Sequence, residues 1–525
     1  MTLSAIDTAM VVAYGCFIFA LAQWVSRSKP GEAENSAGYF LAGRALPWWA
    51  IGASLIAANI SAEQIVGTAG SGYAIGLAIS SYEWMAAATL LIVGKFFLPV
   101  FLKNRITTMP EFLEARFGPT IRTVMALFWL ALYIFVNLTS ILWLGSVAVT
   151  QVAGVNQDVA LAGLGLFALA YQIRGGLKAV ALTDIVQVTL LVIGGLVVSG
   201  MALGQLGAGA GIAAGFATLV ARVPDHFHMI LSPGNPHYKD LPGLSVLIGG
   251  MWIANLSYWG FNQYIIQRTL AAKSLAEAQR GIVFAAFLKL LMPMIIVLPG
   301  IAAVLLTPNL AKPDQAYPAM MHLLPSGLLG LVFAALTAAI IASTASKINS
   351  IATIFTLDLY RRKIAPAASE AQLVRVGRIA ACVATALGIL AARPLLGGLD
   401  QAFQYIQEFS GFVTPGITVI FLTGLFWPRA TEAGALAGAV ASVVLSALFR
   451  FGGIAALAAV PFMNRMGIVF AASLALTVVV SLARPAPARE GPGIMAGVHF
   501  GTSRGFAFAS ALVVAILVVL YAVWW

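Results

Sequence analysis

Charged residues are scarce in this sequence, and their scarcity argues against most classes of soluble protein. Asp, Glu, Lys and Arg make up 9% of the 525 residues, against about 25% in ordinary soluble domains. A soluble chain of this length folds into several domains, each of which needs a charged shell. The composition therefore argues against a soluble enzyme, a nucleic-acid-binding protein and a disordered protein.

Cysteine is nearly absent and histidine is rare, which limits disulfide and metal chemistry. The two cysteines, Cys16 and Cys382, both lie in apolar runs, so we predict neither a disulfide framework nor a metal cluster. Three of the five histidines, His226, His228 and His237, share one segment rich in Gly and Pro. We interpret them as polar loop residues rather than a zinc site.

Hydrophobic residues, by contrast, make up 60% of the chain and occur in long runs. A membrane-spanning helix needs about 20 mostly apolar residues. We predict an all-α, polytopic membrane protein with about 14 transmembrane helices. Their approximate ranges are 3–25, 46–68, 76–102, 122–151, 157–173, 179–203, 244–266, 281–306, 327–357, 376–393, 401–427, 431–449, 466–483 and 506–525.

The distribution of Lys and Arg predicts the orientation of these helices. If the N-terminus lies outside and the spans alternate, the inside loops carry 21 of the 30 Lys and Arg residues and the outside loops carry six. Such an excess is typical of cytoplasmic loops. We expect a multi-pass membrane protein with both termini outside the cytoplasm. The net charge of +11 then reflects loops that face anionic lipid.

Four charged residues lie well inside predicted spans, namely Glu63, Glu83, Lys289 and Lys347. A charge at the centre of a membrane helix costs at least about 2.5–3.5 kcal/mol, so each needs a physical reason. One interpretation is that they pair with one another in a purely structural network. The interpretation that we favour is a hydrated cavity for a substrate.

Two predicted spans contain the same polar motif near their middle. Residues 58–61 read Ala-Asn-Ile-Ser and residues 254–257 read Ala-Asn-Leu-Ser. Asn and Ser side chains compete with helical backbone hydrogen bonds, which favours a break in each span. Unwound backbone inside a membrane must line a cavity. Two broken spans at corresponding places indicate a five-plus-five inverted repeat.

The span at 327–357 contains small and hydroxyl residues at 338–346. Small residues let helices approach closely, and this packing role is one interpretation. Alternatively, a carbonyl and a hydroxyl of this segment face the carbonyls freed at Ala57 and Ile60. A cage of neutral oxygens suits a monovalent cation better than a divalent one.

Several longer motifs make the sequence similar to the solute:sodium symporter family, and within it to bacterial sodium/galactose symporters. The resemblance runs from about residue 38 to about residue 429, and its motifs are 39–44, 54–64, 81–85, 174–179 with Thr183-Asp184, 262–273 and 403–408. It implies an inverted-repeat core of the LeuT type. The implied parts are a leading helix and loop (1–45), a first half of five helices (46–203), an extracellular loop (204–243), a second half (244–430) and three C-terminal helices (431–525).

The resemblance also implies functional residues. The implied substrate-binding set is Gln64, Glu83, Asn137, Asn255, Lys289 and Gln407. The implied gates are Tyr258, backed by Trp259, on the inside and Phe403 with Thr68 on the outside. The implied sodium ligands are the carbonyls of Ala57, Ile60 and Ala339 and the hydroxyl of Ser343, with Asp184 on the route of ion exit. The function implied is sodium-coupled import of a hexose, such as galactose or glucose, by alternating access in a monomer or weak dimer.

The side-chain chemistry independently favours a sugar. Hexose hydroxyls both donate and accept hydrogen bonds, and Glu, Gln, Asn and Lys together supply both kinds of partner. An aromatic ring covers the apolar face of the sugar ring. A substrate with a carboxylate would be repelled by Glu83.

Four positions depart from the family pattern. Thr68 replaces an outer-gate methionine, Ala86 replaces a serine that touches the sugar, and Ala342 replaces a serine that binds sodium. Lys347 has no counterpart, and we consider that it pairs with Asp184, that it takes the place of the cation, or that it extends to the cytoplasmic surface. The alternatives are therefore a proton-coupled or uncoupled carrier of a related sugar or polyol. A transporter-fold sensor and an intramembrane enzyme are further alternatives from other classes.

Overall fold

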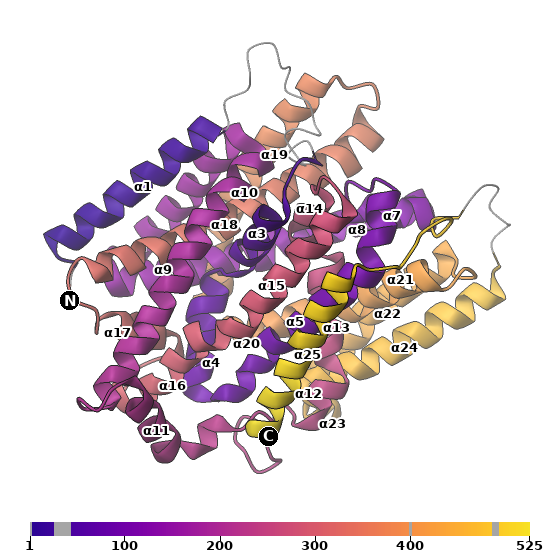
Figure 1. Ribbon diagram of the computed structural model, residues 1–525. Helices are drawn as coiled ribbons and strands as arrows, with labels where there is room; N and C mark the ends of the chain where they lie inside the picture. Colours follow the sequence, from indigo (N-terminus) through magenta and orange to yellow (C-terminus); the bar gives the residue numbers. More distant parts are fainter. Residues whose placement is uncertain (1–2, 26–43, 398–401, 486–492) are drawn as a thin grey trace.

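The computed structural model describes residues 3–25, 44–397, 402–485 and 493–525, without the side chains of 22, 23, 25, 174–184 and 402–405. The described chain is helical, and its extended pairing is a single bridge between Leu46 and Ala272. The predicted all-α class is therefore confirmed. Figure 1 shows a bundle of helices with α1 (Ala5–Val25) and α24 (Phe462–Ala483) on opposite sides.

The first half of the chain supplies the helices α3 to α11. The short π-helix Glu63–Gly67 connects α3 to α4. Their bounds are α3 (Trp48–Asn59), α4 (Thr68–Ala74), α5 (Ser81–Ile92), α6 (Leu98–Lys103), α7 (Met109–Arg116), α8 (Pro119–Leu132), α9 (Thr139–Ala153), α10 (Gln157–Leu206) and α11 (Ile212–Arg222). Further π-helical turns at Val93–Phe97 and Tyr133–Leu138 join α5 to α6 and α8 to α9.

The second half also contains both long helices and interrupted ones. Its elements are α12 (Leu244–Ile248), α13 (Gly250–Leu256), α14 (Gln263–Leu270), α15 (Leu275–Ile295), α16 (Val297–Leu306), α17 (Ala316–Met321), α18 (Leu328–Ile354), α19 (Glu370–Leu396), α20 (Ala402–Ser410), α21 (Thr414–Phe426), α22 (Glu432–Phe451), α23 (Ala455–Ala458) and α25 (Arg504–Val523). The π-helix Phe355–Ile364 extends α18.

Ten helices of the described chain are long and apolar enough to cross a membrane, and a bent pair makes eleven. The chain differs from our expectation at 174–178, where we predict a loop between two spans and α10 instead continues as helix. Gly175 and Gly176 weaken a helix, but unlike proline they keep the backbone donor that a helix needs. The count of fourteen and the inverted repeat stay predictions.

The first predicted break is confirmed. Helix α3 ends at Asn59, Ile60 is extended with φ −72° and ψ 90°, and the next helical segment begins at Glu63. The two helical parts are bent by 61° relative to each other. A helix end leaves carbonyl oxygens without intrahelical partners, so this bend exposes polar backbone inside the bundle.

The second break lies later than the motif at 254–257 indicates, so that part of the prediction is wrong. Helix α13 continues through the π-helix Ser257–Phe261, and the chain becomes extended at Asn262. The hydroxyl of Tyr133 donates to Asn262 Oδ1 and accepts from the backbone amide of Gln263. This side chain from another helix replaces the helical hydrogen bonds that are lost at the break.

Arg268 joins both interrupted spans to α18 and is 1% exposed. Its guanidinium donates to Ser54 of α3 at 2.7 Å, to the carbonyl of Tyr264 in α14, and to Ser346 of α18. The helices α3, α14 and α18 also pack against one another. One planar side chain therefore fixes the three segments that surround the middle of the bundle.

We predict that Arg268→Lys destabilises the protein although it keeps the charge. A lysine ammonium lacks the planar fork that reaches three partners, and each lost hydrogen bond to a charged group costs about 1.5–3 kcal/mol. The thermal unfolding midpoint of the purified protein in detergent should fall by several degrees. The exposed Arg375→Lys is the control and should leave the midpoint unchanged. An unchanged midpoint in Arg268→Lys would contradict the prediction.

Candidate functional site

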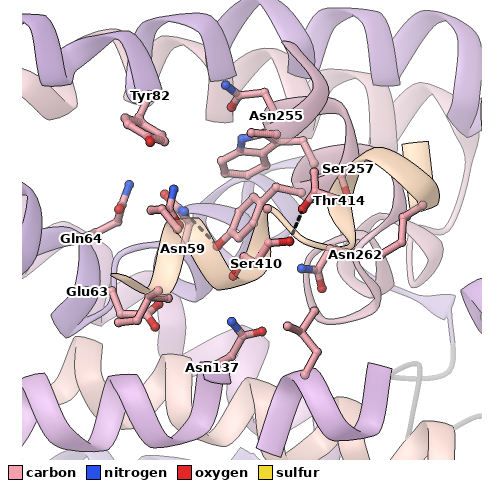
Figure 2. Close-up of a pocket in the computed structure, with 18 of the residues that line it drawn as sticks. Asn59, Glu63, Gln64, Tyr82, Asn137, Asn255, Ser257, Asn262, Ser410 and Thr414 are labelled. Atoms are coloured by element: carbon pink, nitrogen blue, oxygen red, sulfur yellow. Dashed lines mark hydrogen bonds between the residues drawn. The ribbon is translucent and has the colours of Figure 1, made fainter. Parts of the chain in front are cut away.

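A polar cavity of about 120 Å³ lies where the two interrupted spans meet. Its walls come from the two interrupted spans, α5, α8 with the turn Tyr133–Leu138, α15, the α20–α21 region and α24. All six predicted substrate-binding side chains line it, namely Gln64, Glu83, Asn137, Asn255, Lys289 and Gln407. Figure 2 shows Gln64, Asn137 and Asn255 on three sides of the cavity.

The first buried charge pair of the cavity is formed by Glu83 of α5 and Lys289 of α15. The Lys289 ammonium lies 2.5 Å from Glu83 Oε2, and both side chains are 1% exposed. Gln64 Nε2 donates to the other oxygen of Glu83, and Lys289 also donates to Asn59 Oδ1. The ammonium lies 5.0 Å from the centre of the Trp259 ring as well. Four segments of the chain are thus tied together at one place.

Tyr258, the predicted inner gate, continues this network. Its hydroxyl accepts from Asn59 Nδ2 at 3.0 Å and from the hydroxyl of Tyr264. The ring packs edge-on against Trp259, with centroids 5.2 Å apart, and against Tyr264 at 5.7 Å. Tyr258 therefore links the first interrupted span to the second on one wall of the cavity.

The second buried charge pair joins Lys347 of α18 to Glu63. Lys347 Nζ lies 3.5 Å from Glu63 Oε2 and 4.9 Å from the centre of the Tyr264 ring. The hydroxyl of Ser140 in α9 donates to the other oxygen of Glu63. Lys347 is 1% exposed, so our interpretation that it extends to the surface is wrong. Its ion-pair partner among the described side chains is Glu63, and the pairing with Asp184 stays untested.

The four intramembrane charges form two ion pairs, as the first interpretation expects, and the substrate cavity of the second stays a prediction. They pair as Glu83 with Lys289 and Glu63 with Lys347, and three of them also line the cavity. Each pair compensates its own charge, so the cavity is polar without a net charge from these residues. Burial of a charge without such a partner would be strongly unfavourable.

One polar atom of the cavity is left without a protein partner. Asn137 Oδ1 is buried and makes no hydrogen bond within the described chain. Most buried polar atoms in proteins are hydrogen-bonded, and an exception needs an explanation. Because Asn137 faces the cavity (Figure 2), a bound ligand with a hydroxyl donor would satisfy this atom.

The predicted sodium ligands lie at the broken end of α3 and in α18, two elements that pack against each other. Ala57, Ile60 and Ala339 are at most 2% exposed, and Ser343 is fully buried. Ala57 and Ile60 lie at the broken end of α3, where carbonyl oxygens lose helical partners. The Ser343 hydroxyl donates to the carbonyl of Ile340 at 3.0 Å, which leaves its lone pairs available. These oxygens are the donor types that a sodium ion accepts.

The structure describes three further positions that we singled out from the sequence, Thr68, Ala86 and Ala342. Thr68 is buried and its hydroxyl donates to Gln64 Oε1 at 3.4 Å, so it contacts the site through Gln64. Ala86 and Ala342 are also buried. The side chains of Phe403 and Asp184 lie outside the described residues.

Several wall residues escaped the sequence analysis. Asn59 and Tyr264 bond directly to predicted site residues, and Asn262 marks the second break. The sequence did mark Asn59, because it belongs to the motif that predicts the first break, but we did not assign it to the site. Met463 and Met466 of α24 also line the cavity, and nothing in their local sequence distinguishes them from lipid-facing methionines.

The three histidines of the 204–243 segment have separate partners. His226 bonds to the carbonyl of Tyr73, His228 to the carbonyl of Trp525, and His237 to the carboxylate of Asp240. The bonds of His226 and His228 tie this segment to other parts of the bundle, whereas the bond of His237 stays within the segment.

The sequence matches the Sodium:solute symporter family over residues 39–442. The chain is 49% identical to the sodium/glucose cotransporter of Vibrio parahaemolyticus over its whole length and 99% of the relative. It is 36% identical to the sodium/myo-inositol cotransporter 2 of Bos taurus, over 85% of this chain and 69% of the relative. It is also 35% identical to the sodium/glucose cotransporter 4 of Danio rerio, over 85% of this chain and 71% of the relative.

Solved structures show the same fold. A Na⁺-coupled sialic acid symporter in a substrate-bound, outward-open state superposes with a TM-score of 0.81 at 24% identity, over 93% of this chain and all of that one. A transporter of the nucleobase-cation-symport-1 family superposes with a TM-score of 0.54 at 15% identity, over 91% of this chain and 99% of that one. The protein is a multi-pass membrane protein whose solute transport is coupled to sodium, and the chain belongs to the sodium:solute symporter family.

Proposed function

We propose that this protein imports a hexose, such as galactose or glucose, together with sodium by alternating access. The observation that supports the proposal is the cavity between the interrupted spans, which all six predicted substrate-binding side chains line and in which the Asn137 Oδ1 atom has no hydrogen-bond partner among the described residues. Amide, carboxylate and ammonium groups from different helices converge there on a space that a small polyhydroxyl molecule fits. The 49% identical sodium/glucose cotransporter supports the same substrate class.

The charge balance of the cavity favours a neutral substrate. Lys289 is paired with Glu83 and Glu63 with Lys347, and the described lining residues include no arginine. A carboxylate substrate is usually held by the planar fork of an arginine or by an unpaired cation. A sugar or polyol instead needs neutral and paired groups that donate and accept hydrogen bonds. We therefore disfavour an acidic sugar, although a structural neighbour is a sialic acid symporter.

Tyr258 and Trp259 provide the apolar part of the proposed site. Their rings lie beside the polar network and line the same cavity. One face of a pyranose ring carries axial C–H groups, so stacking on an aromatic ring removes water from both surfaces. The position of Tyr258 near the second break supports its role as a gate that moves with that segment.

Sodium would be held by the carbonyls of Ala57, Ile60 and Ala339 and by the hydroxyl of Ser343. These groups give four oxygens, where the family pattern gives five because it has serine at position 342. Water can supply the missing ligand at a small entropic cost. Lys347 does not compete for this role, since its charge is already compensated by Glu63. We therefore expect sodium to bind more weakly than in relatives with both serines.

The substrate is tested by uptake into proteoliposomes that contain the purified protein. Radiolabelled galactose, glucose, myo-inositol and sialic acid are compared, each with an inward sodium gradient and with choline in place of sodium. The proposal expects sodium-dependent accumulation of a hexose. Preferential uptake of myo-inositol would assign a polyol, as in the 36% identical relatives. Hexose uptake that is unchanged in choline would reject sodium coupling in this protein.

We predict that Glu83→Ala abolishes measurable uptake. The substitution removes a carboxylate that bonds to Gln64 and Lys289, and it leaves the Lys289 ammonium buried without its partner. Breaking such a pair costs about 3–5 kcal/mol, so the purified variant should also be less stable. The uptake assay and the unfolding midpoint in detergent are measured together.

The double variant Glu83→Gln with Lys289→Gln separates the two effects. It removes both charges at once and keeps the hydrogen-bonding groups, so stability should recover towards the wild-type value. Uptake should remain low if the two charged groups contact the sugar. Normal uptake by the double variant would show that the pair has only a structural role.

We predict that Ala342→Ser lowers the sodium concentration that gives half-maximal uptake. The added hydroxyl restores a fifth oxygen ligand. One such polar contact contributes about 1 kcal/mol to binding, so the half-maximal sodium concentration should fall roughly fivefold. Ala345→Ser is the matched control, because Ala345 is equally buried on the same helix. The half-maximal concentration should not change in the control. An equal effect in both variants would contradict the proposed sodium site.

A further inference from the structure

A second pocket lies away from the cavity, and we call it the basic pocket. Its volume is about 500 Å³. Five of its lining side chains are basic or can become so, namely Arg44, Lys103, Arg105, Lys273 and His499. They come from four separate segments of the chain, before α3, after α6, before α15 and before α25. No carboxylate is among the lining residues that the structure describes.

The walls of the basic pocket are held together by backbone contacts. Leu46 forms a bridge with Ala272, and its amide donates to the carbonyl of Ala271 at 3.0 Å. Asn104 Nδ2 donates to the carbonyl of Ile494 at 2.9 Å. The first contacts join the segment before α3 to the segment before α15, and the Asn104 bond joins the end of α6 to the segment before α25, without using the charges of the basic side chains.

Two arginines of the pocket have an unusual backbone conformation. The φ angles of Arg44 and Arg105 are 55° and 51°, a left-handed region that non-glycine residues seldom adopt. Arg44 Nη2 donates to the carbonyl of Arg105 at 2.8 Å, which couples the two positions. Such conformations persist where the surrounding structure imposes them, and they are frequent at functional sites.

The basic groups lack acidic partners. Within the described chain, neither Arg105 nor Lys273 lies within ion-pair distance of a carboxylate, and Lys103 donates to the carbonyl of Gly497. Burial and the neighbouring charge of Arg105 lower the pKa of Arg44, and Glu111 only partly offsets this. An anion in the pocket would therefore relieve repulsion among like charges.

The nearby carboxylates are already engaged elsewhere. Glu111 accepts from the backbone amides of Thr107 and Thr108 at 2.6 and 3.3 Å. Glu277 accepts from the amide of Trp48 at 2.8 Å and pairs with Arg280. Both carboxylates satisfy backbone donors at helix starts, so the basic pocket is left for an external anion.

The position of the pocket indicates where that anion comes from. It lies at the ends of three candidate spans, Leu77–Lys103, Leu275–Leu306 and Arg504–Val523. Our orientation puts this end at the cytoplasmic surface, where anionic lipids are concentrated. Pro99, Leu102 and Val498 add apolar surface to the same pocket. A basic recess with an apolar side, at headgroup level, matches a phospholipid better than a fully hydrated ion.

We propose that the basic pocket binds a phosphate group, supplied by the headgroup of an anionic phospholipid at the cytoplasmic membrane surface. Arg105 and Lys273 contact the phosphate oxygens, while Arg44 and Lys103 hold the walls. The bound lipid ties the start of α15 to the end of α6 and to the segment before α25. A soluble phosphate ester offers the same chemistry, and the experiment distinguishes the two sources.

The test measures the unfolding midpoint of the purified full chain in an uncharged detergent. Phosphatidylglycerol is titrated into the micelles, with phosphatidylcholine as the neutral lipid. Inorganic phosphate and glycerol 3-phosphate form the soluble arm at constant ionic strength. The pocket variant is Arg105→Gln with Lys273→Gln. The control variant is Lys363→Gln with Arg375→Gln, which removes two exposed charges that our predicted orientation puts on the same side of the membrane.

We predict that phosphatidylglycerol raises the midpoint of the wild-type protein and of the control variant with the same half-saturating fraction. Each basic residue near an anionic surface contributes about 1 kcal/mol to the free energy of lipid binding, and about 1.4 kcal/mol changes a dissociation constant tenfold. Half-saturation in the pocket variant should therefore need about 30-fold more lipid. If this variant does not fold, Lys273→Gln alone should give about a fivefold change.

The other outcomes are also decisive. Glycerol 3-phosphate or inorganic phosphate could raise the midpoint of the wild-type protein but not of the pocket variant, while the lipid has no effect. That result would support a phosphate site and overturn the lipid as the source of the phosphate. Equal protection of the pocket and control variants, or no protection by any phosphate compound, would overturn the proposal. Sugar uptake is not measured, so the result is independent of the proposed transport function.

Discussion

Compensation of buried charge is the constraint on which the interior of this bundle depends. Glu83 and Glu63 are carried by different helices, and each needs a lysine from a third or fourth helix to remain inside the membrane. The lysines, Lys289 and Lys347, come from the second half of the chain. Each pair therefore fixes the distance between the two halves, and neither half can move without changing the surroundings of a buried charge.

This constraint also accounts for the character of the cavity. Paired charges give a space that is polar but neutral, with amides and aromatic rings between the pairs. Broken helices are stable at this depth because they border such a polar space. The same break that opens the cavity frees the carbonyls of Ala57 and Ile60 for an ion. Solute and sodium would thus share one structural element, which is a physical basis for coupling their movements.

Hydropathy and composition were enough to predict the helical membrane fold and most of its spans, because the lipid bilayer imposes length and apolarity on each segment separately. The first break was also predictable from local sequence, because the side chains of Asn59 and Ser61 compete with the hydrogen bonds of the helix backbone. The six predicted substrate-binding side chains do line one cavity. Their convergence was inferred through resemblance and through the cost of burying polar groups, rather than from spacing along the chain.

Only the tertiary structure decided which groups are partners. Glu63 pairs with a residue 284 positions away, and no local pattern specifies that contact. The second break occurs at Asn262 because Tyr133, from another helix, satisfies the opened backbone. The same holds for the wall that α24 adds to the cavity and for the four segments of the basic pocket. Local sequence determines which segments enter the membrane, whereas packing between distant helices determines which side chains meet.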